Sequence, residues 1–229
     1  MTTTQELQEL IDTRFGGVIS DGSHRAGAAA CSMEIISVYR GIEWTDDPAT
    51  VRSFDYRNLN DGCWSTDAVR TVHLLPLMAA MDGSLDWPAD RQQAFIEEII
   101  RETVRRIIPG LPDLPEDVRA ACREVKTLAE CRNAGLLAAS ALPAMMDWPA
   151  AEWAASDVVW AAARAAERQP AGAARGVASA SRNAAAALLI APEIAAETPP
   201  EAADGDAVLK IACDIWIKAA SYAAGDGSR

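Results

Sequence analysis

Apolar side chains recur three and four positions apart through most of the chain, which is the spacing of a helix face. Residues 4–14 show it first, with an apolar face made of Leu7, Leu10 and Ile11. Two consecutive glycines follow and are expected to end that helix. No stretch shows the sustained alternation of apolar and polar residues that a strand would require. The pattern therefore predicts an all-α protein, a compact bundle of many helices.

Prolines, glycines and capping residues divide the remaining chain into further helices. The expected helices run from 28 to 40, from 49 to 58, onward from a cap at Ser65, from 88 to 108, from 115 to 131, over 149–190 in two pieces split at Pro170, and from about 206 to 224. A loop is predicted over residues 43–48, because the residue before a proline is pushed toward extended geometry. In the helix after Ser65, the face expected to point inward consists of Val69, Val72, Leu75 and Met78.

Two features shape the expected bundle. The sequence Asp-Trp-Pro occurs at residues 86–88 and 147–149. In each, the aspartate is expected to cap a helix and the proline to occupy its first turn, where a missing N–H costs nothing. Residues 149–190 are rich in alanine, which favours closely packed helices. Trp153 and Trp160 lie seven positions apart on one face there and are expected to be buried anchors.

Charge limits the classes of partner. Acidic residues outnumber basic ones by 33 to 21, for a formal net charge of −12. A nucleic-acid groove or an anionic membrane surface requires clustered Lys and Arg, so we expect no direct binding to nucleic acid or membrane. The N-terminus is polar and acidic, and no apolar run is long enough to span a membrane, so we expect a cytoplasmic protein. Five scattered cysteines are expected to be reduced thiols.

The first 61 residues hold most of the unusual polar chemistry. We interpret residues 1–229 as a single domain, in which a loop-rich, acidic N-terminal module (residues 1–61) precedes a helical, alanine-rich remainder (62–229). The candidate binding residues of the module are Asp21, His24, Cys31, Glu34, Trp44, Asp46, Asp47, Asn60 and Asp61.

These residues have three interpretations. In a structural scaffold, the acids Asp21, Glu34, Asp46 and Asp61 are partly buried acceptors that tie the loop 41–48 onto the preceding helix, with Trp44 as the apolar anchor and His24, Arg52 and Arg57 as donors. In a zinc site, the ligands are His24, Cys31, Glu34 and Asp46, although no standard ligand spacing is present. In a nucleophilic site, His24 activates the thiol of Cys31.

A resemblance accompanies these residues. The run D-G-x-H, C-x-M-E, G-x-x-W-T-D-x-P and N-D, followed by an alanine-rich helical half, resembles an uncharacterised family of proteins from actinobacteria and their phages. The matching residues are Asp21, Gly22, His24, Cys31, Met33, Glu34, Gly41, Trp44, Thr45, Asp46, Pro48, Asn60 and Asp61. Relatives carry a second cysteine and a proline after D-x-P, where this chain has Ala49, Thr50 and Ser53, which weakens a metal site. The resemblance implies a compact helical fold and a phage origin, and no reaction.

Two functional hypotheses follow. The chain has no G-x-G-x-x-G, P-loop or G-x-S-x-G motif, which argues against the usual nucleotide enzymes and hydrolases. The leading hypothesis is a non-enzymatic acidic protein without a cofactor that binds a basic or nucleic-acid-binding protein, as a phage or mobile-element inhibitor of host defence. The alternative is a metal- or ligand-binding protein, or an enzyme, with its site around His24, Cys31, Glu34 and Asp46. The oligomeric state is not indicated.

Overall fold

The computed structural model describes residues 3–142, 150–194 and 205–224, with the backbone alone over 188–194. These residues form helices and no strand, which confirms the predicted all-α class. In chain order the helices are α1 (Thr4–Arg14), α2 (Ser32–Tyr39), α3 (Arg57–Asn60), α4 (Asp67–Met81), the 3-10 helix η1 (Ser84–Asp86), α5 (Ala89–Arg106), the 3-10 helix η2 (Ile108–Gly110), α6 (Glu116–Arg123), α7 (Leu128–Ala141), α8 (Ala150–Ala166), α9 (Pro170–Ile194) and α10 (Gly205–Ala223). No helix in these ranges is both long and apolar enough to cross a membrane.

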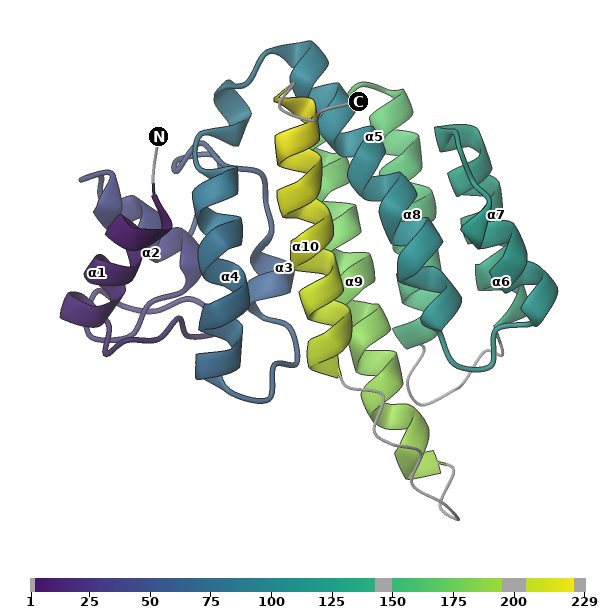
Figure 1. Cartoon of the computed structure of the whole chain (residues 1–229), viewed down its shortest axis with the longest axis horizontal. Coiled ribbons are helices and arrows are strands. Elements are labelled where there is room, and N and C mark those ends of the chain that lie inside the picture. The colour runs from purple at the N-terminus through teal and green to yellow at the C-terminus, as the bar shows by residue number, and fades with distance from the viewer. Residues whose placement is uncertain (1–2, 143–149, 195–204, 225–229) are drawn as a thin grey trace.

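The long helices stand side by side in a bundle (Figure 1). Helix α10 lies in its middle and packs against α4, α5 and α9, while α8 packs between α7 and α9. The short helices α1 and α2 lie beside α4 at one end of the bundle, and α6 and α7 lie at the other. The N-terminal module is therefore at one flank, where α3 also contacts α9.

Aromatic contacts join the module to the bundle. The ring of Tyr56, from the module, meets Trp216 of α10 edge-on at 6.2 Å between centroids. Phe95 of α5 stacks on Phe54 at 5.3 Å and meets Trp216 at 5.6 Å. All four side chains are fully buried. Since aromatic pairs of this geometry add to the free energy of burial, the module and the long helices are stabilised together.

Several predicted helices are present with small changes at their ends. Helix α1 has the predicted bounds, and α5 begins one residue and ends two residues inside its predicted range. Its buried face includes Phe95, Ile99 and Val104. Helix α9 begins at Pro170 as expected. Helix α2 is shorter than predicted and starts at Ser32, because Glu34 caps the chain at that point.

The predicted helix over 49–58 is wrong. Residues 47–52 form a turn whose backbone is held by Asp47, which accepts hydrogen bonds from the main-chain N–H groups of Ala49 and Thr50. Arg52 then adopts a left-handed conformation with φ of 56°, which cannot continue a right-handed helix. Only residues 57–60 are helical.

The start and inner face of α4 also differ from the prediction. Thr66 is the N-cap, and Ser65 instead donates from its main-chain N–H to the Asp206 carboxylate at 2.8 Å. Leu75 and Met78 are buried, but Val72 is 67% exposed. Arg70 and Thr71 take inward positions, because their polar groups bond the chain that precedes α4.

Two further corrections concern helix starts. The predicted helix over 115–131 is two helices, because Thr127 and Glu130 form a capping box that begins α7. At the start of α5 the N-cap position is Pro88, and no side chain caps it. Asp86 pairs with Arg52 across 34 positions of sequence. Asp147 lies outside the described residues.

The tryptophans of α8 are exposed, contrary to the prediction. Trp153 is 48% exposed and Trp160 is 40% exposed. Trp160 lies over α9 where Gly172 and Gly176 leave room, and Arg164 covers its ring at 5.1 Å. Alanine and glycine bring α8 and α9 so close together that a large side chain is excluded from the space between them.

Candidate functional site

Glu34 lies at the centre of the module and is 1% exposed. Its carboxylate accepts hydrogen bonds from the main-chain N–H of Cys31 at 2.7 Å and of His24 at 2.6 Å. The Nδ1 atom of His24 lies 3.1 Å from the same carboxylate. Glu34 is therefore the buried acceptor that the scaffold interpretation predicted, but the loop that it fastens to α2 is the one before the helix and not the loop 41–48.

Trp44 ties the following loop to the same centre. Its Nε1–H donates to the carbonyl oxygen of His24 at 2.9 Å, and its ring meets Phe15 at 6.1 Å. The main-chain N–H of Thr45 lies 3.4 Å from the hydroxyl of Ser37 on α2. The predicted attachment of this loop to α2 is confirmed, and the part-buried Trp44 is its anchor.

Asn60 and Asp61 close the module from α3. Asn60 is fully buried; its side-chain oxygen accepts from the N–H of Ser32, and its amide donates to the carbonyl of Ser20 at 3.0 Å. One oxygen of Asp61 accepts from the N–H of Gly22 at 2.8 Å. The two side chains join segments 28 and 39 positions away in sequence.

Two predicted roles in the scaffold are wrong, those of Asp21 and Arg52, and Asp47 serves only a local turn. The Asp21 side chain is 71% exposed, with one carboxylate oxygen 4.0 Å from Arg70, so it is no buried acceptor. Asp47 is exposed, and its carboxylate accepts hydrogen bonds within the turn at 47–50. The hydrogen bond from the hydroxyl of Thr50 holds the pKa of Asp47 below its usual value. Arg52 pairs with Asp86 and not with the module acids.

A polar cavity of about 440 Å³ opens between the module and α9. Its lining residues are Gly22, Ser23, Cys31, Asp46, Asp55, Arg57, Asn58, Asp61 and Arg175. The cavity brings together the predicted residues Cys31, Asp46 and Asp61. His24, Glu34 and Asn60 support its walls through the hydrogen bonds above and do not line it.

Asp55 organises this cavity. Arg57 donates to both oxygens of Asp55 at 3.0 Å, and the Nε–H of Arg175 donates to one of them at 2.9 Å. Burial opposes ionisation of Asp55, but the hydrogen bonds and charge of Arg57, together with Arg175, hold the pKa of this carboxyl below its usual value. The resulting ion-pair group fixes the guanidinium of Arg175, 120 positions away in sequence, against the module.

Cys31 is not poised as a nucleophile. Burial raises the pKa of its thiol to about 12, so the thiol is protonated at neutral pH. Its neighbour His24 points to Glu34 through Nδ1. In the part of the chain that the structure describes, no three His, Cys, Asp or Glu side chains form a group that could hold a metal ion. Asp46 instead lies 3.7 Å from Nη1 of Arg57, so the four proposed zinc ligands do not converge.

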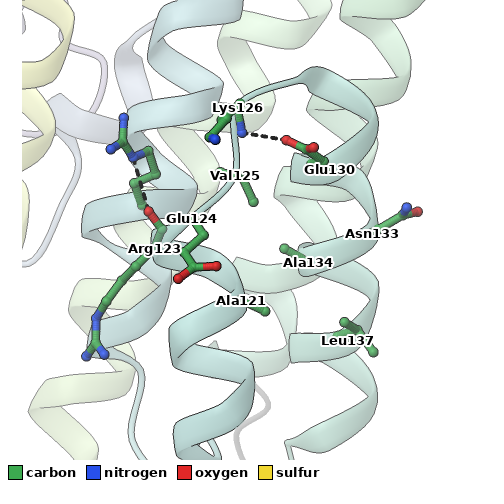
Figure 2. Close-up of a pocket in the computed structure, with 10 residues that line it drawn as sticks. Ala121, Arg123, Glu124, Val125, Lys126, Glu130, Asn133, Ala134 and Leu137 are labelled. Atoms are coloured by element: carbon green, nitrogen blue, oxygen red, sulfur yellow. Dashed lines mark hydrogen bonds between the residues drawn. The ribbon is translucent and has the colours of Figure 1, made fainter.

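A second hollow, of about 840 Å³, lies between α6 and α7 (Figure 2). Two of its charged side chains, Glu130 and Arg105, bond main-chain groups at helix ends. Figure 2 shows Glu130 turned toward the main chain of Lys126, whose N–H donates to it at 2.6 Å. The Nε–H of Arg105 donates to the carbonyl oxygen of Arg123 at 3.3 Å. We therefore regard the cavity beside α9 as the candidate site.

Reasoning from the sequence missed two residues of the cavity. Asp55 lies between Phe54 and Tyr56, and a carboxylate between two core aromatics is a signal for a buried ion pair. Nothing in the local pattern around Arg175 indicates a contact with the module.

Comparisons of the chain with protein-family models, curated proteins and solved structures find no match. The resemblance to the actinobacterial and phage family thus stays a prediction, and functional inference rests on the geometry of the described residues.

Proposed function

We propose that the protein binds a basic protein partner through the acidic flank of its N-terminal module. The surface concerned, called the acidic face below, consists of Glu6, Glu9 and Asp12 on α1 together with Ile42 and Glu43. The observation that carries the proposal is that these carboxylates, on α1 and on the segment that runs beside it, form no ion pair with a described Lys or Arg.

Two contacts make this surface continuous. The hydroxyl of Tyr39 donates to Glu6 near the start of α1, and the ring of Trp44 meets Phe15 just after its end. The chain from 39 to 44 therefore runs alongside α1. Ile42, which is 38% exposed, and Glu43 lie within this segment.

The three carboxylates of α1 accept hydrogen bonds from uncharged donors. Glu6 accepts hydrogen bonds from Thr3 and Tyr39, while glutamine amides donate to Glu9 and Asp12. The main-chain and side-chain bonds from Thr3 lower the pKa of Glu6, so it is charged at neutral pH. Hydrogen bonds from neutral donors orient the carboxylates and leave their negative charge for a cationic partner.

The partner class follows from the charge. A surface of carboxylates attracts proteins that carry clustered Lys and Arg, and nucleic-acid-binding proteins are rich in such clusters. Occupation of a groove that otherwise holds phosphates would inhibit the partner, which fits an inhibitor carried by a phage or mobile element. The exposed Ile42, next to Glu43 in the segment beside α1, supplies the apolar contact that electrostatic attraction lacks.

The experiment is capture of binding proteins from the host with matched charge variants. The test variant Glu6→Gln/Glu9→Gln/Asp12→Asn removes three charges from the acidic face and keeps the Thr3 capping box, which accepts glutamine. The control variant Glu116→Gln/Asp117→Asn/Glu124→Gln removes three charges around α6, at the other end of the bundle. We expect wild type and control to capture the same basic protein, and the test variant to lose it. Equal capture by both variants would refute the proposal.

A further inference from the structure

The cavity beside α9 contains hydrogen-bonding groups that the protein itself does not use. Asp55 is saturated by Arg57 and Arg175. Arg175 makes that contact through Nε, and neither of its Nη groups donates to a described residue. The side-chain amide of Asn58 also makes no hydrogen bond within the described residues.

Unused acceptors face the same space. Asp46 has Arg57 as its nearest cation, at 3.7 Å, which is longer than a hydrogen bond. One oxygen of Asp61 accepts from Gly22 and Asn60, and the other accepts no hydrogen bond from a described residue. The cavity thus offers donors from α3 and α9 and acceptors from the module loops.

We propose that this cavity binds a small zwitterion of the α-amino-acid class, with its carboxylate on the Nη groups of Arg175 and its ammonium on Asp46 and Asp61. A guanidinium fork matches a carboxylate in a bidentate arrangement, and an ammonium carries three donors for carboxylate oxygens. The ion pair with Asp55 holds the fork in place before the ligand arrives, which reduces the entropy lost on binding.

Size and charge narrow the ligand further. The cavity volume of about 440 Å³ lies within the roughly 300–1,000 Å³ typical of small-molecule sites. Three aspartates against two arginines leave the lining with a net charge of −1. A basic amino acid, with net charge +1, neutralises this charge, so L-lysine should bind more tightly than L-glutamate. The inference does not depend on the acidic face.

Calorimetric titration with three related probes tests the assignment. L-lysine carries both groups, cadaverine lacks the carboxylate, and 6-aminohexanoate lacks the α-amino group. We expect L-lysine to bind, and each truncated probe to bind about tenfold more weakly or worse, because a charge-assisted hydrogen bond is lost. Absence of L-lysine binding at millimolar concentration, or equal binding of cadaverine, would overturn the proposal.

Variants locate the binding in this cavity. Arg175→Met should abolish L-lysine binding, and Arg175→Lys should restore part of it, since it returns the charge without the fork. Arg182→Met, also exposed on α9, is the control and should bind as wild type does. Because the Arg175 side chain is 60% exposed, its loss should leave the fold intact, which circular dichroism checks. Unchanged binding by a folded Arg175→Met protein would place the ligand elsewhere and refute the assignment.

Discussion

Replacement of Glu34 by alanine should destabilise the protein strongly. The carboxylate is buried and accepts the main-chain N–H groups of Cys31 and His24. Each buried donor left without an acceptor costs about 1–3 kcal/mol. The Cys31 donor is buried and the His24 donor is partly buried, so the sum is about 3 kcal/mol. For a chain of this size such a loss lowers the melting temperature by about 6–12 °C.

Thermal and urea unfolding followed by circular dichroism measure this loss. Glu43→Ala removes an exposed glutamate from the neighbouring loop and should change the free energy of unfolding by less than about 0.5 kcal/mol. Glu34→Gln keeps an acceptor oxygen and should lose roughly half as much stability as the alanine variant. If Glu34→Ala melted within about 2 °C of Glu43→Ala, the carboxylate would not organise the module, and our reasoning would be wrong.

Four further outcomes are expected. Asp55→Asn should destabilise the protein above about pH 4. Because the pKa of Asp55 is lowered in the folded state, the stabilisation from its carboxylate is lost as the pH falls through that pKa. Urea unfolding at acid pH should therefore give wild type and Asp55→Asn similar free energies of unfolding. Gly176→Ala should lower the melting temperature, since a Cβ there would lie 2.8 Å from the Trp160 ring and 3.2 Å from a backbone oxygen, whereas Gly172→Ala, with contacts of 3.6 Å or more, should be neutral or stabilising. Asp86→Ala should melt close to wild type, because this side chain caps no helix and its ion pair with Arg52 is exposed and contributes little to stability. Elemental analysis of the purified protein should find zinc below one ion per chain; a full equivalent would revive the metal site.

The elements predicted well are those whose signals are local. Helix α1 and the inner face of α5 repeat apolar residues at helical spacing, and Glu34 lies three positions after its own cap. Such patterns depend on neighbours within one or two turns. The helix predicted over 49–58 is absent because the side chain of Asp47 and the left-handed conformation of Arg52 turn the chain there. The spacing of apolar residues carries no information about such a turn.

The candidate site was predicted only in part, because its geometry is made over long distances in sequence. Asp46 and Asp61 were identified from their polar surroundings. The ion pair of Asp55 with Arg175 joins residues 120 positions apart and depends on the contact between α3 and α9. Likewise, the exposure of Trp160 follows from how closely α8 approaches α9, which alanine content alone does not determine.

The acidic face is tested most directly by the affinity of the captured basic protein at two salt concentrations. We predict that wild-type protein binds tightly at low salt and loses affinity steeply as the salt is raised, because exposed charges are screened over about 10 Å at 0.1 M. The variant Glu6→Gln/Glu9→Gln/Asp12→Asn should bind at least about tenfold more weakly at low salt and depend less on salt. Equal affinities and equal salt dependence for the two proteins would contradict the proposed function.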